Sequence, residues 1–193
     1  MNYKYPEDIL ARARNIKAVA LDSDGVIFTG HVIEGKEGPL AKTRCHADGQ
    51  GVSLLRAAGI PIVCVTGEHG QHAAFLERLV EKWNGLPSVA SGKWLPIKIF
   101  SGVERLQKVA VVESWLASHR LNLGDCAALG DDLTDYDLLR HVGLAAAPAQ
   151  AEDVVKKVVH FVTPRRGGHG AIRDLANFIL DAKGVDVTSL LLR

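Results

Sequence analysis

The chain has 193 residues, of which 47% are hydrophobic and 23% charged, and its formal net charge is +1. This length suits one domain with a substantial core, and the near-neutral charge excludes a general attraction to nucleic acid or to an anionic membrane. No apolar run approaches the length of a membrane span, and the N-terminal stretch MNYKYPEDIL lacks the apolar core of a signal peptide, so we expect a cytoplasmic protein.

Short apolar runs alternate with longer segments of helical periodicity. The runs that predict strands are residues 17–22, 61–67, 97–102, 126–132, 143–149 and the weaker 158–162. Apolar residues recur at helical spacing in residues 75–83, 103–120, 133–143 and 170–184, the last two ending at a glycine. This alternation predicts an α/β fold, a Rossmann-like, doubly wound parallel sheet with helices on both faces.

Residues 26–46 interrupt the alternation. They contain two short extended arms around a charged, glycine-rich turn, which predicts a β-hairpin flap after the first strand. Residues 81–96 are rich in glycine, serine and proline and predict a loop too short to link two domains, so we expect a single domain over residues 1–193. Cys64 and Cys126 lie in apolar runs without metal-type spacing, which indicates buried free thiols.

Polar side chains follow three of the predicted strands and lie near the start of one predicted helix. These residues are Asp22, Asp24, Thr66, Lys108, Asp131 and Asp132. In an open α/β sheet, ligands bind beyond the carboxyl ends of the strands, so we expect these side chains to converge on one crevice. Two carboxylates about 4 Å apart repel by roughly 4 kcal/mol at an effective dielectric constant near 20, and a divalent cation would offset this cost. Clustered carboxylates and phosphate oxygens favour Mg²⁺.

This set of side chains suits phosphoryl transfer. The sequence DSD at residues 22–24, which we call the DSD motif, supplies two carboxylates. One can attack phosphorus and form an acyl phosphate. The other can protonate the leaving oxygen and then deprotonate water. Thr66 and Lys108 can bind the phosphoryl oxygens, whose charge must be neutralised in the transition state. A receiver domain also combines acids, a Thr and a Lys around Mg²⁺, but the order here, with DSD first and GDD last, argues against one.

The motifs LDSDGV, VTG with Thr66, Lys108 and GDDLTD occur in the order and spacing of the haloacid dehalogenase superfamily of phosphatases. The chain resembles this family from about residue 17 to residue 181. The resemblance implies that Asp22 is the nucleophile and Asp24 the acid/base.

The resemblance also implies metal contacts. Asp22, Asp24 and Asp131 would bind Mg²⁺, and Asp132 would support the metal or Lys108. The residues that we expect to bind phosphate or substrate are Thr66, Gly67, Glu68, Lys108, Arg165 and Arg166.

The stretches HADGQGVSLLRAAGIPIVCVTG and RRGGHGAIRD resemble the capless, tetrameric branch of the family, which includes phosphatases of 3-deoxy-D-manno-octulosonate 8-phosphate. This likeness implies a domain without a cap, a homotetramer and a small sugar-acid phosphate as substrate, with octulosonate 8-phosphate favoured. The apolar tail VTSLLLR, residues 187–193, would contribute to the tetramer by docking on a neighbouring subunit.

Two departures from the branch leave alternatives open. The expected TDG reads FTG, with Thr29 in place of an acid, and the expected TGR reads TGE, with Glu68. Phosphatases of nine-carbon keto-sugar acid 9-phosphates match better at Glu68 and remain an alternative. A non-catalytic assembly module is a further alternative, whose mark would be loss of Asp22 or Asp24, and both are present.

Basic residues near the sequence GGHG, residues 167–170, which we call the C-terminal glycine motif, are candidates for substrate recognition. Arg165 or Arg166 could meet a substrate carboxylate with the bidentate guanidinium fork, whereas Arg173 is interpreted as an ion-pair residue. His46 and His169 could either line the pocket or serve a structural role.

Overall fold

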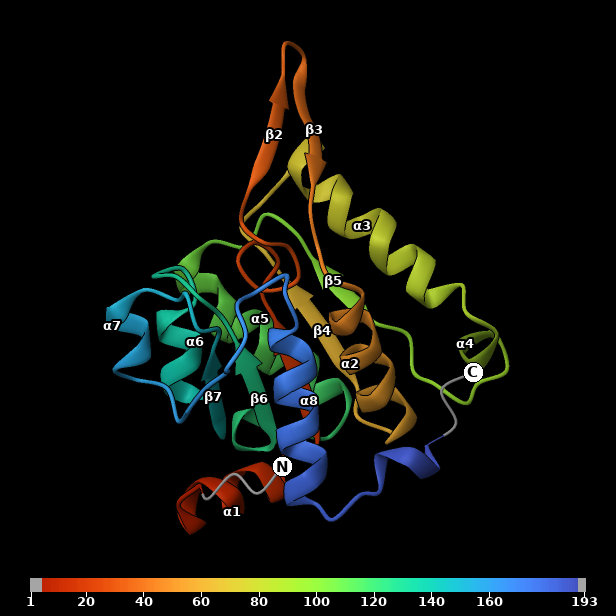
Figure 1. The fold of residues 1–193 in the computed structure, drawn as a ribbon, viewed down its shortest axis with the longest axis vertical. Helices are drawn as coiled ribbons and strands as arrows, with labels where there is room; N and C mark the ends of the chain where they lie inside the picture. The colour runs from red at the N-terminus through yellow and green to blue at the C-terminus, as the bar shows by residue number, and fades with distance from the viewer. Residues whose placement is uncertain (1–4, 191–193) are drawn as a thin grey trace.

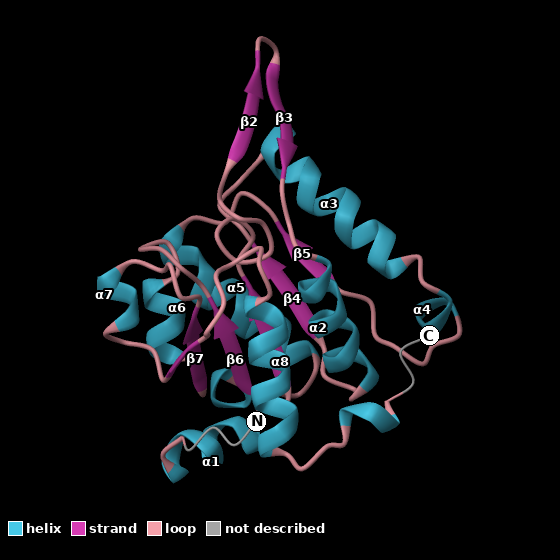
Figure 2. Ribbon diagram, viewed as in Figure 1, coloured by secondary structure: helices cyan, strands magenta, loops and turns pink. Residues whose placement is uncertain are grey.

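The structure, a computed structural model, describes residues 5–190. Over this range the chain forms a six-stranded parallel sheet in the order β5-β4-β1-β6-β7-β8 (Figures 1 and 2). The strands are β1 (Ala18–Leu21), β4 (Ile62–Val65), β5 (Lys98–Phe100), β6 (Cys126–Leu129), β7 (Leu144–Ala147) and β8 (Phe161–Val162). Each strand lies inside one of the six predicted runs, so the predicted parallel sheet is confirmed.

Helices cover both faces of the sheet because alternate residues of a strand point to opposite sides. In β1, Val19 and Leu21 belong to one core cluster and Ala18 and Ala20 to another. The helices that pack on the first cluster are α1 (Glu7–Asn15), α2 (His46–Ala57), α3 (Gly70–Asn84) and α8 (Ala171–Ala182). Those on the second are α5 (Arg105–Ser118), α6 (Tyr136–His141) and α7 (Asp153–Lys156).

A two-stranded hairpin projects from the sheet beside the first turns of α3 (Figure 1). Its antiparallel strands are β2 (Val32–Gly35) and β3 (Gly38–Lys42). The predicted flap is confirmed but is shorter than residues 26–46, because residues 26–28 are buried in the turn after β1 and His46 begins α2. Among the described residues no cap domain is inserted.

The segment 81–96, predicted to be a loop, is partly helical. Its first residues complete α3, and a short helix, α4 (Pro87–Ala90), follows. The buried guanidinium of Arg56 donates hydrogen bonds to the carbonyl oxygen of Leu95 and to the side-chain amide oxygen of Asn84. This contact with α2 orders the segment, and sequence periodicity does not reveal it.

The cysteine prediction is confirmed, since Cys64 and Cys126 are buried and free. The tail differs in part from the prediction: Val187 and Leu190 pack against the chain's own core, and residues 191–193 lie outside the described residues. None of the helices in residues 5–190 combines the length and the apolarity that a membrane span requires.

Candidate active site

The DSD motif forms a tight turn at the carboxyl end of β1. The backbone N–H of Asp22 still donates to Leu129 of β6, at 3.1 Å, which holds Asp22 at the sheet edge. The carbonyl oxygen of Ser23 then accepts from three backbone amides in residues 26–28, which closes the turn. Gly25 has φ +76°, and a Cβ atom there would lie 1.9 Å from Asp131 Oδ2. A glycine is therefore required where this turn meets the carboxylate of Asp131.

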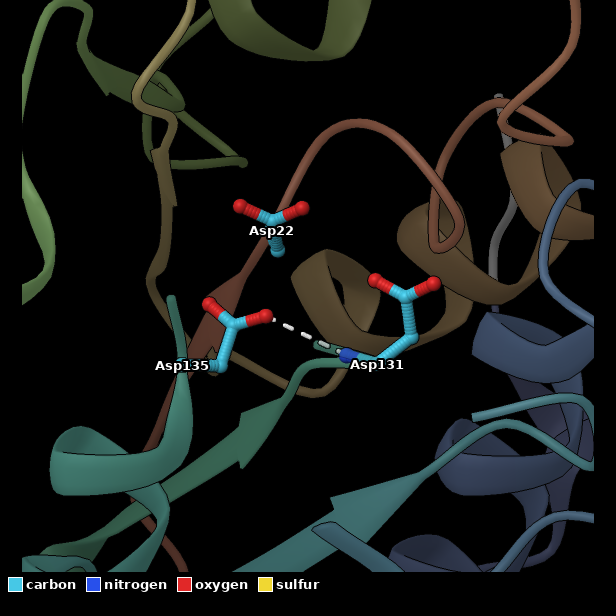
Figure 3. Close-up of side chains that lie close together, drawn as sticks. All are labelled: Asp22, Asp131 and Asp135. Atoms are coloured by element: carbon cyan, nitrogen blue, oxygen red, sulfur yellow. Dashed lines mark hydrogen bonds between the residues drawn. The ribbon is translucent and has the colours of Figure 1, made fainter. Parts of the chain in front are cut away.

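Three carboxylates from two parts of the chain lie around a common space at this edge (Figure 3). Asp22 follows β1, while Asp131 and Asp135 lie between β6 and α6, and one oxygen of each lies within 4.8 Å of the others. The Asp131 N–H donates to Asp135 Oδ2 at 3.2 Å, as the dashed line in Figure 3 shows. These residues form what we call the three-carboxylate cluster.

Lys108 of α5 connects two members of this cluster. Its ammonium Nζ lies 2.7 Å from Asp22 Oδ1 and 2.6 Å from Asp135 Oδ1, and its side chain is 1% exposed. Burial alone would lower the pKa of Lys108, but the charges of Asp22 and Asp135 outweigh it and raise the pKa above its ordinary value. The side chain therefore remains a cation inside the site.

Burial and neighbouring carboxylates raise the pKa of two members of this cluster, Asp22 and Asp131. Burial, followed by the charge of Asp135, raises the pKa of Asp22 well above its usual value, although Lys108 opposes the shift. Burial and the charges of Asp135 and Asp132 raise the pKa of Asp131 to about 7. An all-oxygen donor set that disfavours its own negative charge fits a hard divalent cation such as Mg²⁺. The residues present therefore fit the predicted metal.

Thr66 follows the last residue of β4. Because β4 is the neighbour of β1 in the sheet, Thr66 lies near the three-carboxylate cluster. It is buried, and its hydroxyl accepts from the Glu68 N–H at 3.1 Å. Its backbone carbonyl accepts from Val103 N–H, which ties this loop to the start of α5. Gly67 is exposed at the tip of the same loop. The structure thus brings Thr66, Gly67 and Lys108 to the sheet edge that carries Asp22.

Known proteins resemble this chain in sequence and in fold. The profile of a family described as haloacid dehalogenase-like hydrolase matches residues 55–173. The chain belongs to this family. The chain is also 29% identical to the 3-deoxy-D-manno-octulosonate 8-phosphate phosphatase KdsC of Yersinia pestis over 177 residues, which cover 92% of this chain and 86% of that protein.

Solved structures of similar proteins agree with this assignment. A probable YrbI family phosphatase from Pseudomonas syringae has a TM-score of 0.81 and 32% identity, with 93% of each chain covered. The 3-deoxy-D-manno-octulosonate 8-phosphate phosphatase from Moraxella catarrhalis, in complex with a magnesium ion, a phosphate ion and a KDO molecule, has a TM-score of 0.80 and 26% identity, covering 93% of this chain and 94% of that one. The predictions of the family and of an enzyme that hydrolyses phosphoric monoesters are confirmed.

Two of the acids predicted for this haloacid dehalogenase-like site lie elsewhere. Asp132 is exposed and accepts from the Leu133 N–H, and buried Asp135 is the acid that contacts Lys108, so of the two roles expected for Asp132 only support of the metal stays a prediction. The Asp24 carboxylate is not part of the three-carboxylate cluster, because Lys42 of β3 holds its Oδ2 at 2.6 Å. This excludes the Asp24 side chain from the cluster, and the metal contact expected of Asp24 stays a prediction.

The C-terminal glycine motif supports the DSD turn from outside the sheet. The Gly168 N–H donates to the carbonyl of Val26 at 2.8 Å. The side-chain amide of Gln150, which the sequence interpretation did not include, donates to Gly25 O at 2.7 Å and accepts from Gly167 N–H at 2.8 Å. Gln150 thereby bridges two loops of the site that lie far apart in sequence.

The basic residues of this region do not take the predicted partners. Asp174 occupies the fork of Arg165, with Nε at 2.9 Å and Nη2 at 2.6 Å from one carboxylate oxygen, so this fork is not free for a substrate carboxylate. Arg173 was expected to form an ion pair but donates from Nε to the amide oxygen of Asn177 instead. Arg166 is exposed, which leaves it accessible to a ligand.

The remaining candidates lie at the surface. His46 is the first residue of α2 and His169 lies in the glycine motif, and both are exposed. The Glu68 carboxylate lies 3.8 Å from His72 Nδ1, and the other ring nitrogen of His72 faces Glu34 of the hairpin at 4.0 Å. Glu68 thus lies on the loop that follows β4, on the side that faces the hairpin.

Proposed function

We propose that this enzyme is a Mg²⁺-dependent phosphatase that hydrolyses 3-deoxy-D-manno-octulosonate 8-phosphate through an aspartyl phosphate on Asp22. The observation that carries the proposal is the position of Asp22 at the end of β1, between the ammonium of Lys108 and the carboxylate of Asp131. A nucleophilic carboxylate with a cation on one side and a candidate metal position on the other suits attack on a phosphate dianion. The similarity to octulosonate 8-phosphate phosphatases supports the substrate.

Asp22 and Asp131 would hold the metal ion. Asp135 already accepts from Lys108 through Oδ1 and from the Asp131 N–H through Oδ2, so it orients both groups. When bound, the ion supplies positive charge to the phosphoryl oxygens and lowers the repulsion between phosphate and carboxylates.

In the first half-reaction, Asp22 attacks phosphorus. Lys108 binds Asp22 Oδ1, which leaves Oδ2 as the attacking atom. The bond between phosphorus and the ester oxygen of the sugar breaks, and this oxygen takes a proton from the carboxyl group of Asp24. Thr66 and Lys108 stabilise the phosphoryl oxygens through hydrogen bonds.

In the second half-reaction, water attacks phosphorus and its proton returns to the carboxylate of Asp24. The bond between phosphorus and Asp22 breaks, and inorganic phosphate leaves. Asp22 and Asp24 thus recover their starting states, and the two half-reactions sum to hydrolysis of one ester bond.

The proposal includes a cytoplasmic homotetramer whose subunit is a single domain over residues 1–193. The hairpin supports assembly because it exposes large apolar side chains, with Ile33 56% and Leu40 67% exposed. Contact between hairpins would bury these side chains and shield the neighbouring sites from water.

The test is phosphate release from octulosonate 8-phosphate with Mg²⁺ and, separately, with excess EDTA. We expect turnover only with the metal, and no phosphate release from an Asp22→Asn variant that remains folded. Lack of activity on this compound, on nine-carbon keto-sugar acid 9-phosphates and on p-nitrophenyl phosphate would favour the non-catalytic module instead.

A further inference from the structure

We infer that Lys42, on hairpin strand β3, is the positioning residue that holds Asp24 in place for proton transfer. The inference rests on the proposed function, because it concerns the acid/base of the same site. It extends that function by giving the hairpin a direct part in catalysis, beyond covering the crevice.

The ion pair between Lys42 and Asp24 is fully buried on the lysine side. Lys42 Nζ lies 2.6 Å from Asp24 Oδ2, and the Lys42 side chain is 1% exposed, against 25% for Asp24. The ring of Phe28 lies beneath the ammonium at 5.8 Å from its centroid. A buried ammonium requires a well-placed oxygen acceptor, so this contact strongly constrains both side chains.

The base of the hairpin fixes where Lys42 can reach. The Thr29 N–H donates to the carbonyl of Thr43 at 3.0 Å, and the two hydroxyl oxygens lie 2.8 Å apart. Lys42 precedes Thr43 directly, and Asp24 forms an isolated bridge with Phe28, next to Thr29. The backbone segments that carry the two charges are therefore joined within a few residues of each charge.

Each carboxylate of the DSD motif consequently has its own buried lysine. Lys108 of α5 holds Asp22, and Lys42 of the hairpin holds Asp24. Both lysine side chains are 1% exposed, but they come from different elements of the fold. The arrangement assigns one cation to the nucleophile and a separate one to the acid/base.

The pairing also limits how the Asp24 carboxyl group can turn. Oδ2 is engaged by Lys42, whereas Oδ1 is a buried side-chain atom that has no hydrogen-bond partner within residues 5–190. The terminal torsion of an aspartate is otherwise soft, so little else fixes the plane of this carboxyl group. Loss of Lys42 would therefore disturb proton transfer at Asp24 while leaving Asp22 and Lys108 in place.

The test compares two substrates that differ in their need for a proton. The alkoxide leaving group of octulosonate 8-phosphate must be protonated, whereas nitrophenolate leaves p-nitrophenyl phosphate without a proton. We expect Lys42→Met to lower kcat/KM for the sugar phosphate by about 10²-fold, the lower end of what acid–base catalysis contributes, and for p-nitrophenyl phosphate by less than about threefold.

The second half-reaction provides an independent signature. Since water must lose its proton to Asp24, Lys42→Met is expected to show a rapid burst of nitrophenol, about one per active site, before slow turnover. Lys42→Arg keeps the charge and should recover part of the lost activity on the sugar phosphate. Lys36→Met, at the exposed turn of the same hairpin, is the matched control and should behave as the wild type.

The outcomes separate this inference from the proposed function. Equal losses on both substrates, or no loss on either, would overturn the positioning role of Lys42. A wild-type protein that hydrolyses neither substrate would instead overturn the proposed function. If Lys42→Met does not fold, Lys42→Gln replaces it. The loss of kcat/KM on the sugar phosphate, relative to the loss on p-nitrophenyl phosphate, then tests the positioning role in the same way.

Discussion

Gly167 packs so closely against Gly25 that a Cβ atom on Gly167 would lie 1.7 Å from the Gly25 carbonyl oxygen. This contact joins the C-terminal glycine motif to the turn that carries Asp22 and Asp24. Because the neighbouring atom belongs to the backbone, no side-chain rotation can relieve the overlap. The glycine motif therefore acts as a support for the DSD turn.

Gly167→Ala is expected to displace this turn and lower kcat by at least about tenfold. It should also lower the free energy of unfolding by about 1–3 kcal/mol, as overpacking does, measured by urea denaturation. Gly85→Ala is the matched control, because the Cβ there would meet its nearest atom at 3.5 Å. A Gly167→Ala enzyme with wild-type kcat and stability would contradict the supporting role of the motif.

Asp135, and not Asp132, is expected to be required for activity. Asp135→Asn removes one of the two carboxylates that hold Lys108, so we expect kcat to fall by about 10²-fold and the free energy of unfolding by about 1–3 kcal/mol. Asp132→Asn, on the exposed neighbour, should change the free energy of unfolding by less than about 0.5 kcal/mol and leave kcat near the wild type. Steady-state kinetics and urea denaturation of the two variants provide the measurement, and the reverse order of effects would refute the assignment.

Mg²⁺ is expected to stabilise the folded protein in the absence of substrate. A ligand at 100 times its dissociation constant adds about 2.7 kcal/mol, which for a chain of this size raises Tm by about 5–10 °C. Asp131→Asn should remove most of this shift, since Asp131 is one of the two proposed ligands. Differential scanning calorimetry with and without Mg²⁺ at constant ionic strength tests this, and an equal shift in the variant would exclude Asp131 as a ligand.

The free energy of unfolding is expected to fall as the pH drops below about 6.5. His160 Nδ1 accepts the Ala145 N–H of β7 at 2.9 Å, which requires the neutral ring. Burial, followed by the charge of Arg12, lowers the pKa of His160 in the folded state. The unfolded chain then binds more protons than the folded chain between the two pKa values, so stability is complete above this window and is lost below it.

The measurement for His160 is the urea midpoint between pH 7.5 and pH 5. His160→Asn places an amide oxygen that does not titrate near the Ala145 N–H, so this variant should show a smaller loss of stability in acid. His31→Asn, at an exposed position of the hairpin, serves as the control and should retain the wild-type pH dependence. An unchanged slope in His160→Asn would contradict the role of His160.

Strand-end residues could be predicted from the sequence because a buried apolar run fixes where a strand ends. Asp22, Thr66 and Asp131 lie at such ends, and the structure places them at one edge of the sheet. The sequence could not show which acid of GDDLTD faces Lys108, since that depends on the path of the turn before α6. Asp132 and Asp135 are the same residue type, and only the directions of their side chains distinguish them: Asp135 accepts from Lys108, and Asp132 accepts from the Leu133 N–H.

Contacts between distant segments were the other part that sequence reasoning missed. The pairing of Arg165 with Asp174 depends on how α8 meets the preceding loop, and that of Lys42 with Asp24 depends on the register of the hairpin. Gln150 bonds backbone atoms of two distant loops, and no pattern of residue types signals such contacts. In each case the missing information was the direction of a side chain in irregular structure.

The substrate prediction depends on Glu68, whose N–H donates to the Thr66 hydroxyl and whose side chain is 40% exposed on the loop after β4. We expect a kcat/KM for octulosonate 8-phosphate that exceeds the value for glucose 6-phosphate by about 10²-fold or more, because a site built for particular polar groups rejects ligands that lack them. Glu68→Arg removes a carboxylate that could accept hydrogen bonds from the additional polar groups of a nine-carbon sugar. This variant should therefore raise the ratio of kcat/KM for octulosonate 8-phosphate to that for a nine-carbon 9-phosphate by about tenfold. A panel of the three phosphates with both enzymes tests this: a wild-type preference for the nine-carbon compound would replace the proposed substrate, and equal activity on glucose 6-phosphate would leave only a general phosphatase.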